Sequence, residues 1–191
     1  MKLKKINAAL ALLSILLLLA HVGFSVFAYL TMYYNPILTL VFAWPFMITA
    51  CLHAVCGILT VFLHADGTRL DLYPKKNLRT ILQRVSAALI FPLLILHIKN
   101  FALMKDCAER GQKGFVFLLF FGEILFFAVI VTHVATSLTK AFITLGWLIS
   151  VEKQKKLDRM VYILGAVIFA VMVYAIVKGQ VMMFLSDEVI P

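Results

Sequence analysis

Histidines are the residues of this chain that are best placed to do chemistry. The chain has five of them: His21, His53, His64, His97 and His133. All but His64 fall well inside long apolar runs, such as "LQRVSAALIFPLLILHIKNF" at residues 82–101, where His97 stands near the end. An imidazole inside a lipid bilayer is costly, and it is by default a functional hypothesis. A hydrogen bond between helices would explain one such histidine equally well, but it explains four of them poorly.

The elements that must position these histidines are membrane-spanning helices. Of the 191 residues, 63% are hydrophobic, whereas a soluble domain holds about 45–50% apolar residues. The chain contains runs of roughly 20 or more apolar residues, each long enough to cross a hydrocarbon core about 30 Å thick. We expect five spans in a single domain, residues 1–191, at about 7–31, 38–63, 81–104, 114–138 and 160–184. The sequence therefore predicts an all-α membrane protein, a bundle of five transmembrane helices.

The first apolar run continues to Thr31 without a small-residue cleavage site, so we interpret it as a span and not as a signal peptide. The distribution of Lys and Arg then predicts the orientation. Thirteen of them fall in the N-terminal segment, the 64–84 loop and the 139–159 loop, and five fall on the other side. The positive-inside rule places the N-terminus in the cytoplasm and the C-terminus outside. The net charge of +9 is explained by these loops, and no nucleic-acid partner is expected.

The histidines inside the spans fall at two depths. With this orientation, His21 and His97 lie in the outer half of the membrane, about ten and seven residues below the outer ends of their helices. His53 and His133 lie in the inner half, about ten and five residues above the inner ends of theirs. At 1.5 Å per residue, the two pairs are separated by roughly 10–15 Å along the membrane normal.

Two pairs of imidazoles indicate two metal macrocycles. Histidines on facing helices of a bundle can hold a haem iron from both sides. A lone metal ion would require three or four ligands close together, usually with carboxylates or thiolates among them. The only carboxylate within a span is Glu123, and Cys51, Cys56 and Cys107 form no CxxC pair. The pattern therefore predicts two bis-histidine haem b groups, which would carry electrons across the membrane.

Two short segments resemble a known family. The stretch "LQRVSAALIFPLLILHIK" resembles the third helix of the dihaem cytochrome b membrane-anchor subunits of succinate:quinone oxidoreductases and quinol:fumarate reductases. That helix opens with Gln-Arg-(Val/Ile)-(Ser/Thr) and carries a haem ligand about thirteen residues after the Arg, matched here by Gln83, Arg84, Val85, Ser86 and His97. The segment "HVATSLTKAFITLGW", from His133, is similar to the fourth-helix ligand segment, His-x-x-x-(Gly/Ser)-Leu-(Arg/Lys). Helix number, histidine order and topology extend the resemblance over nearly the whole chain.

The resemblance implies the same ligand pairs that depth predicts. His21 and His97 would ligate the distal, outer haem, and His53 and His133 the proximal, inner haem. Some family members have a glutamate two residues before the fourth-helix ligand, where this chain has Val131, and no Asp or Glu precedes Asp66. These departures put transmembrane proton compensation of the family's kind in doubt.

The resemblance also implies the function and the partners. The chain would be the anchor subunit of a succinate dehydrogenase or fumarate reductase in the bacterial cytoplasmic (inner) membrane. It would pass electrons between menaquinone, or another quinone, and an iron–sulfur subunit. The chain carries no flavin fingerprint and no iron–sulfur cysteine array. The iron–sulfur and flavoprotein subunits must therefore be partners on the cytoplasmic side, and the chain would not act on dicarboxylates by itself.

The remaining candidate site residues are Glu123, Arg84, Lys140 and Ser86. Glu123 would exchange protons with quinol beside the outer haem, although a hydrogen-bonded packing role explains it equally well. Arg84 and Lys140 are expected to bind the anionic propionates of the inner haem, with interfacial anchoring as the alternative. Ser86 belongs to the motif of the third span and is assigned to the same cofactor site.

Two alternative functions stay open at this point. The chain could anchor another quinone-linked oxidoreductase, such as a hydrogenase or a formate dehydrogenase, although those membrane cytochromes have four helices and another histidine distribution. It could also be a haem-free membrane transporter with buried histidines.

His64, at the inner edge of the second span, is expected to be an interfacial residue.

Overall fold

The computed structural model describes residues 2–63 and 74–185, with side chains of the third helix described from residue 78 onward. Its helices are α1 (Lys2–Thr31), α2 (Pro36–Leu63), α3 (Pro74–Glu109), α4 (Lys113–Leu145) and α5 (Val151–Phe184). All five are long and apolar enough to cross a membrane, α3 from Leu78 onward. The prediction of an all-α protein with five membrane-spanning helices is thereby confirmed. His64 lies outside the described residues, and so does most of the connection that follows it.

The helices extend beyond the predicted spans at most of their ends. The third helix begins at Pro74, and the fourth ends at Leu145, so part of each predicted basic loop is helical. The cause is that an apolar run marks the bilayer crossing and not the helix ends. Residues such as Lys, Arg, Gln and Leu favour helix, and the helices therefore continue into the polar interface.

Local signals fix the turns between the helices. Pro36 opens α2, and the Asn35 side chain accepts a hydrogen bond from the Leu38 backbone N–H at 3.1 Å, an N-cap followed by proline at the first helical position. Ser150 caps α5 by accepting from the Lys153 N–H at 3.5 Å. Gly146 closes α4 with a φ of 82°, a left-handed conformation that glycine adopts without strain.

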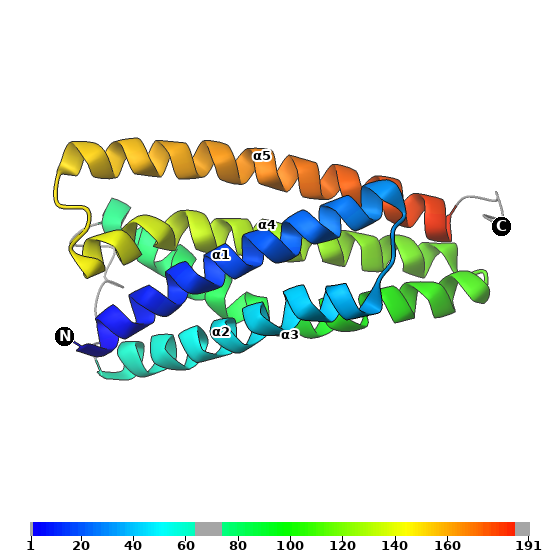
Figure 1. Ribbon diagram of the computed structural model, residues 1–191, viewed down its shortest axis with the longest axis horizontal. Helices are drawn as coiled ribbons and strands as arrows, with labels where there is room; N and C mark the ends of the chain where they lie inside the picture. The colour runs from blue at the N-terminus through cyan, green and yellow to red at the C-terminus, as the bar shows by residue number, and fades with distance from the viewer. Residues whose placement is uncertain (1, 64–73, 186–191) are drawn as a thin grey trace.

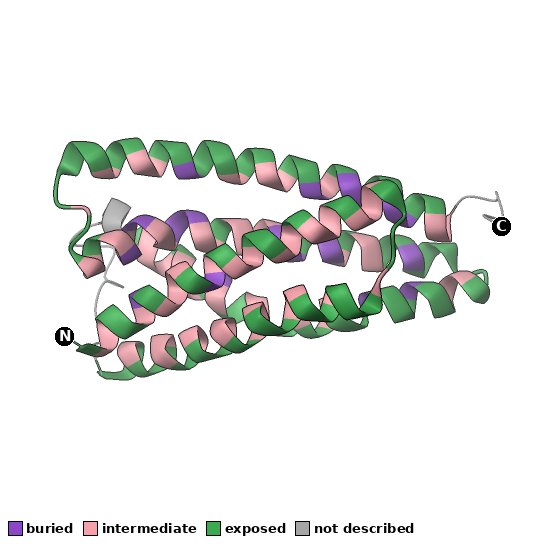
Figure 2. Cartoon of the chain, viewed as in Figure 1, coloured by how far each residue is buried: buried purple, intermediate pink, exposed green. Residues whose placement is uncertain are grey.

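Helix α4 is the centre of the bundle (Figure 1). It packs against α3, α1 and α5, whereas α2 packs mainly against α1. The apolar core joins Phe126 and Phe127 of α4 to Met172 and Ile176 of α5, with side chains of α1 and α3 around them. Helix α2 has no buried residue, and Figure 2 shows it on the outside of the bundle. Its exposed apolar side chains suit contact with lipid.

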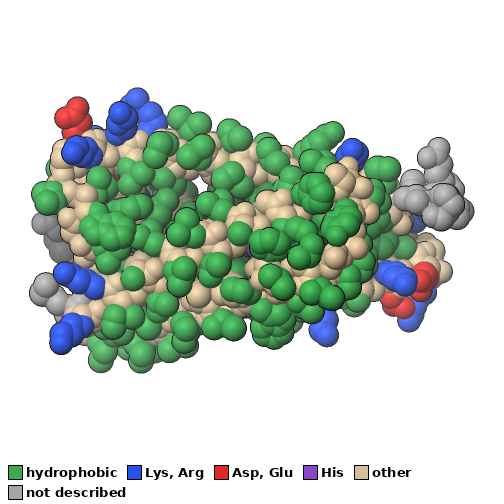
Figure 3. Space-filling model, viewed as in Figure 1, with side chains coloured by type: hydrophobic (Ala, Val, Ile, Leu, Met, Phe, Trp, Pro, Cys, Tyr) green, Lys and Arg blue, Asp and Glu red, His purple; other side chains and the backbone are tan. Residues whose placement is uncertain are grey.

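The two ends of the bundle are chemically distinct from its middle. The start of α1 and the α4–α5 connection lie at one end, which we call the N-terminal end, and the end of α5 lies at the other, the C-terminal end (Figure 1). In the space-filling view of Figure 3, hydrophobic side chains cover the middle of this face, and charged side chains gather toward both ends. This banding is the pattern that a bilayer requires of a spanning protein.

Helices α1 and α5 approach each other closely near the C-terminal end. A Cβ atom added at Gly179 would lie 2.3 Å from Cδ1 of Tyr29, so only glycine fits there. Small residues permit such close backbone approaches between membrane helices. This contact fixes α5 against the half of the bundle that holds His21 and His97.

Candidate functional site

The imidazoles of His53 in α2 and His133 in α4 lie close together, in an edge-to-face arrangement. Their ring centroids are 6.3 Å apart, and the ring planes are inclined by 62°. A bond between a metal and an imidazole nitrogen is about 2.0–2.1 Å long, so two imidazoles on opposite sides of one metal have centroids about 6 Å apart. The observed centroid separation is close to this value.

Backbone carbonyl groups fix the tautomer of both imidazoles. Nδ1 of His133 lies 3.1 Å from the carbonyl oxygen of Gln83, and Nδ1 of His53 lies 3.2 Å from that of Asn7. A carbonyl oxygen only accepts hydrogen bonds, so each Nδ1 must carry the proton and each Nε2 keeps a free lone pair. Metal-ligating histidines bind in this way, with the other ring nitrogen bonded to a carbonyl or a carboxylate.

Ser86 adds a second contact to His133. Its hydroxyl lies 3.2 Å from Nδ1 of His133 and donates to the Gln83 carbonyl at 3.0 Å. Because that donation uses the hydroxyl proton, the oxygen is available to accept from the imidazole. Ser86 is 4% exposed, and this buried serine contacts the imidazole of His133.

His97 is held by a carboxylate. Its Nδ1 is hydrogen-bonded to Oε1 of Glu123, and Asn100 donates to Oε2 of Glu123 at 2.8 Å. The ring also lies against Phe126, with centroids 4.9 Å apart. Glu123 is 4% exposed, and both of its oxygens are occupied. Bonding of Nδ1 to a carboxylate again leaves Nε2 for a metal.

His21 is oriented differently from its predicted partner. Its ring stacks on Phe46 of α2, with centroids 6.1 Å apart and planes inclined by 13°. In the described part of the chain, its aromatic contact is with Phe46 and not with His97. The outer pair is thus less closely assembled than His53 and His133.

Orphaned polar atoms on α1 test whether a prosthetic group fits the interior. Oδ1 of Asn7, Oγ of Ser14 and Nδ1 of His21 are buried and have no hydrogen-bond partner. These residues are seven apart, and two helical turns place them on one face of α1. Buried polar atoms normally have partners; the hydroxyls of Thr49 and Thr60, for example, donate to carbonyls of their own helix. The hydroxyl of Ser14 and the imidazole of His21 could donate to an acceptor such as a haem propionate, whereas the amide oxygen of Asn7 could not. Only part of this set therefore fits a haem.

The predicted propionate-binding residues lie near His133. The ammonium group of Lys140 donates to Oγ1 of Thr80 and to Oε1 of Gln83, each at 2.9 Å. Arg84 is half-buried and follows Gln83 directly on α3. Lys140 therefore contacts the side chain of Gln83, the residue whose backbone carbonyl accepts from His133.

Several site residues escaped the sequence-based prediction. Gln83 and Asn7 contribute backbone carbonyls, which no side-chain pattern can reveal. Asn100 had a detectable signal, because a position three residues after His97 shares its helix face. A further polar cluster joins three helices. Arg79 of α3 donates to both oxygens of Asp158 in α5 at 2.8 and 2.9 Å, and Thr139 of α4 donates to Asp158 at 2.6 Å.

Among the described residues, no group of three or more His, Cys, Asp or Glu side chains could hold a metal ion. The chain matches no protein-family model, no curated protein and no solved structure. The functional assignment must therefore rest on the residues and their geometry.

Proposed function

We propose that the chain is the dihaem cytochrome b anchor subunit of a succinate dehydrogenase or fumarate reductase complex. His53 and His133 ligate the inner haem b, and His21 and His97 ligate the outer one. The observation that carries the proposal is the separation of 6.3 Å between the His53 and His133 rings. In both of these residues, Nδ1 is bonded to a backbone carbonyl and Nε2 remains for iron.

Each neighbouring residue has a defined task in this proposal. The carbonyls of Asn7 and Gln83 hold the inner imidazoles in the ligand tautomer, and Ser86 adds a second acceptor to His133. Glu123 does the same for His97. Bound haem iron supplies one-electron transfer, and the protein sets its potential through ligands, burial and such hydrogen bonds. The role of the chain is thus to bind and orient two redox centres.

Quinone reacts at the outer pair in this proposal. The soluble partners supply or take electrons at the basic face, so a relay of two haems is needed only if the quinone reacts at the far end. Glu123, the only buried carboxylate among the described residues, accepts the quinol proton there in addition to orienting His97. Menaquinone or another membrane quinone is the substrate.

The partners are an iron–sulfur subunit and a flavoprotein subunit. They dock at the N-terminal end of the bundle, where Lys2, Lys4 and Lys5 precede the first apolar run. The positive-inside rule makes this end cytoplasmic and the C-terminus external. The complex would reside in the bacterial inner membrane as a multi-pass protein.

The haem content of the purified subunit tests the proposal. A pyridine haemochrome assay should return two b haems per chain, because the histidines form two pairs. A value of zero would reject the cytochrome and favour a haem-free transporter. A value near one would reject the paired scheme.

A further inference from the structure

A surface groove lies between α3, α4 and α5. It has a volume of about 360 Å³, and its walls include Leu82, Ala128, Thr132, Tyr162, Ala166 and Phe169. The walls are mainly apolar, and Tyr162 and Ala166 are exposed. Alanines at positions 128 and 166 leave the volume open because their side chains end at Cβ. An apolar groove that opens on the membrane-facing surface can accept an acyl chain.

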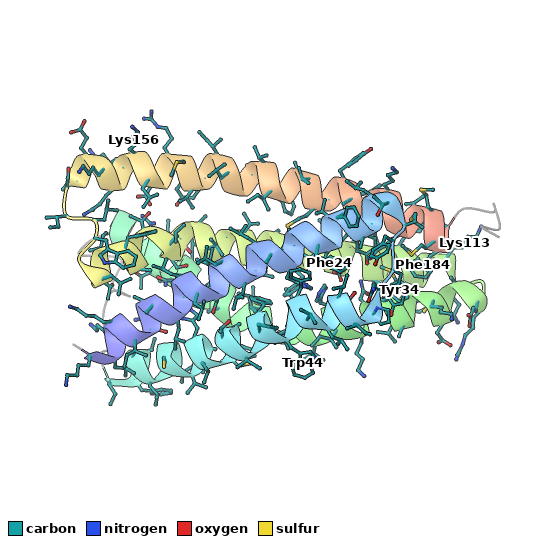
Figure 4. All side chains as sticks on the ribbon, viewed as in Figure 1. Phe24, Tyr34, Trp44, Lys113, Lys156 and Phe184 are labelled. Atoms are coloured by element: carbon teal, nitrogen blue, oxygen red, sulfur yellow. The ribbon has the colours of Figure 1, made fainter. Side chains whose placement is uncertain are left out.

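The α5 wall of the groove continues into basic residues. At about 100° per residue, Lys155 and Arg159 lie within about 40° of the face formed by Tyr162 and Ala166. Both cations are exposed and lie closer to the N-terminal end than the groove does. Lys156 points away from the bundle in Figure 4, and Lys153 lies about 160° around the helix from Lys155. One face of α5 therefore carries cations first and groove-lining residues about two turns later.

The neighbouring carboxylate does not cancel these cations. Asp158 is bonded through both oxygens to Arg79, and Thr139 also donates to it at 2.6 Å. Arg79 donates in addition to the carbonyl of Thr136, a residue of the groove wall, at 2.9 Å. The pair of Arg79 and Asp158 is thus neutral as a whole. Among the described residues, the next carboxylate along α5 is Glu152, one turn before Lys155 at the start of the helix.

We propose that this groove and the adjoining cations form a binding site for an anionic phospholipid. One acyl chain lies along the groove, and the phosphate lies at Lys155 and Arg159. Tyr162 stands between the two parts, at the depth where tyrosine side chains meet headgroups. Basic residues next to a membrane helix attract anionic lipids, and the groove distinguishes a lipid from a soluble anion or an acidic protein. The site is independent of haem binding.

Lipid retention by the purified full-length chain tests this proposal. Native mass spectrometry in detergent would compare phosphatidylglycerol with phosphatidylcholine of identical acyl chains. Wild type should retain phosphatidylglycerol at least roughly tenfold more strongly, given about 1 kcal/mol per cation. The double variant Lys155→Gln/Arg159→Gln should lose this preference, and Lys153→Gln should keep it. Ala166→Leu, which fills the groove, should weaken retention of both lipids.

Other outcomes would overturn the proposal. Equal retention of both lipids by wild type would show that the cations select no headgroup. Loss of the preference in Lys153→Gln as well would show a diffuse charge effect and no site. Unchanged retention by Ala166→Leu, with its helical circular dichroism equal to wild type, would show that the groove holds no chain. A double variant that keeps the lipid preference would show that Lys155 and Arg159 do not bind the headgroup.

Discussion

The imidazoles of His53 and His133 come from α2 and α4 and meet with ring centroids 6.3 Å apart. Two axial ligands of one iron need this spacing, and each ring already has its Nδ1 fixed by a carbonyl. The arrangement thus brings together two imidazoles whose tautomers are fixed by backbone carbonyls. It defines the inner site more sharply than the outer one.

Removal of single histidines should separate the two haems. His53→Ala and His133→Ala should abolish the same spectral component, since the proposal assigns both residues to one iron. His21→Ala and His97→Ala should abolish the other. A redox titration followed at the α-band identifies the component that disappears. If His21→Ala and His53→Ala deleted one common component, the pairing would be refuted.

Ser86→Ala should weaken the inner haem site alone. The hydroxyl contacts Nδ1 of His133 at 3.2 Å, and loss of such a supporting contact typically costs about 10–100-fold in metal affinity. Because the Gln83 carbonyl remains, haem should still bind, with a shifted midpoint potential. Ser137→Ala is the matched control, since Ser137 donates to the backbone carbonyl of His133 and not to its ring. Equal effects of the two changes would argue against the positioning role.

Glu123→Gln should suppress quinol-dependent turnover. Glutamine keeps the size and an acceptor oxygen for His97 but cannot take up a proton at that position. Both haem spectra, and turnover with an artificial donor to the soluble subunits, should remain nearly intact. Normal quinol activity in this variant would remove Glu123 from the proton-transfer step. A quinone found only beside His53 and His133 would overturn the outer site.

Arg79→Ala should destabilise the bundle. The change removes a bidentate ion pair and the bond to the Thr136 carbonyl, and it leaves Asp158 partly buried without its cation. We expect a loss of about 1–3 kcal/mol, seen as a lower midpoint of thermal unfolding in detergent. Arg110→Ala is the control, because its pair with Asp106 is exposed and worth about 0–1 kcal/mol. Equal unfolding midpoints for the two variants would contradict a stabilising role for the contacts of Arg79 with Asp158 and Thr136.

Lengths of apolar runs and helical rise are local properties, and the sequence by itself therefore determined two features of this protein. Five spans follow because about 20 apolar residues cross a bilayer wherever they occur. The depth of each histidine follows from its distance to a helix end. Depth could predict that His53 and His133 lie in the same half of the membrane, and helix packing brings their rings together. The predicted span bounds differ from the helix bounds, because the helices continue into interfacial residues, as far as Pro74 and Leu145.

Only the tertiary structure decided what surrounds each histidine. Every residue has a backbone carbonyl, so nothing in the sequence marks those of Asn7 and Gln83 as acceptors for imidazoles. The bond between Glu123 and His97 depends on the rotation and register of α4 against α3, which side-chain packing sets and which hydropathy does not encode. In the same way, the sequence shows Arg79 and Asp158 only as charged residues near helix ends. Their ion pair forms because α3 and α5 both pack on α4.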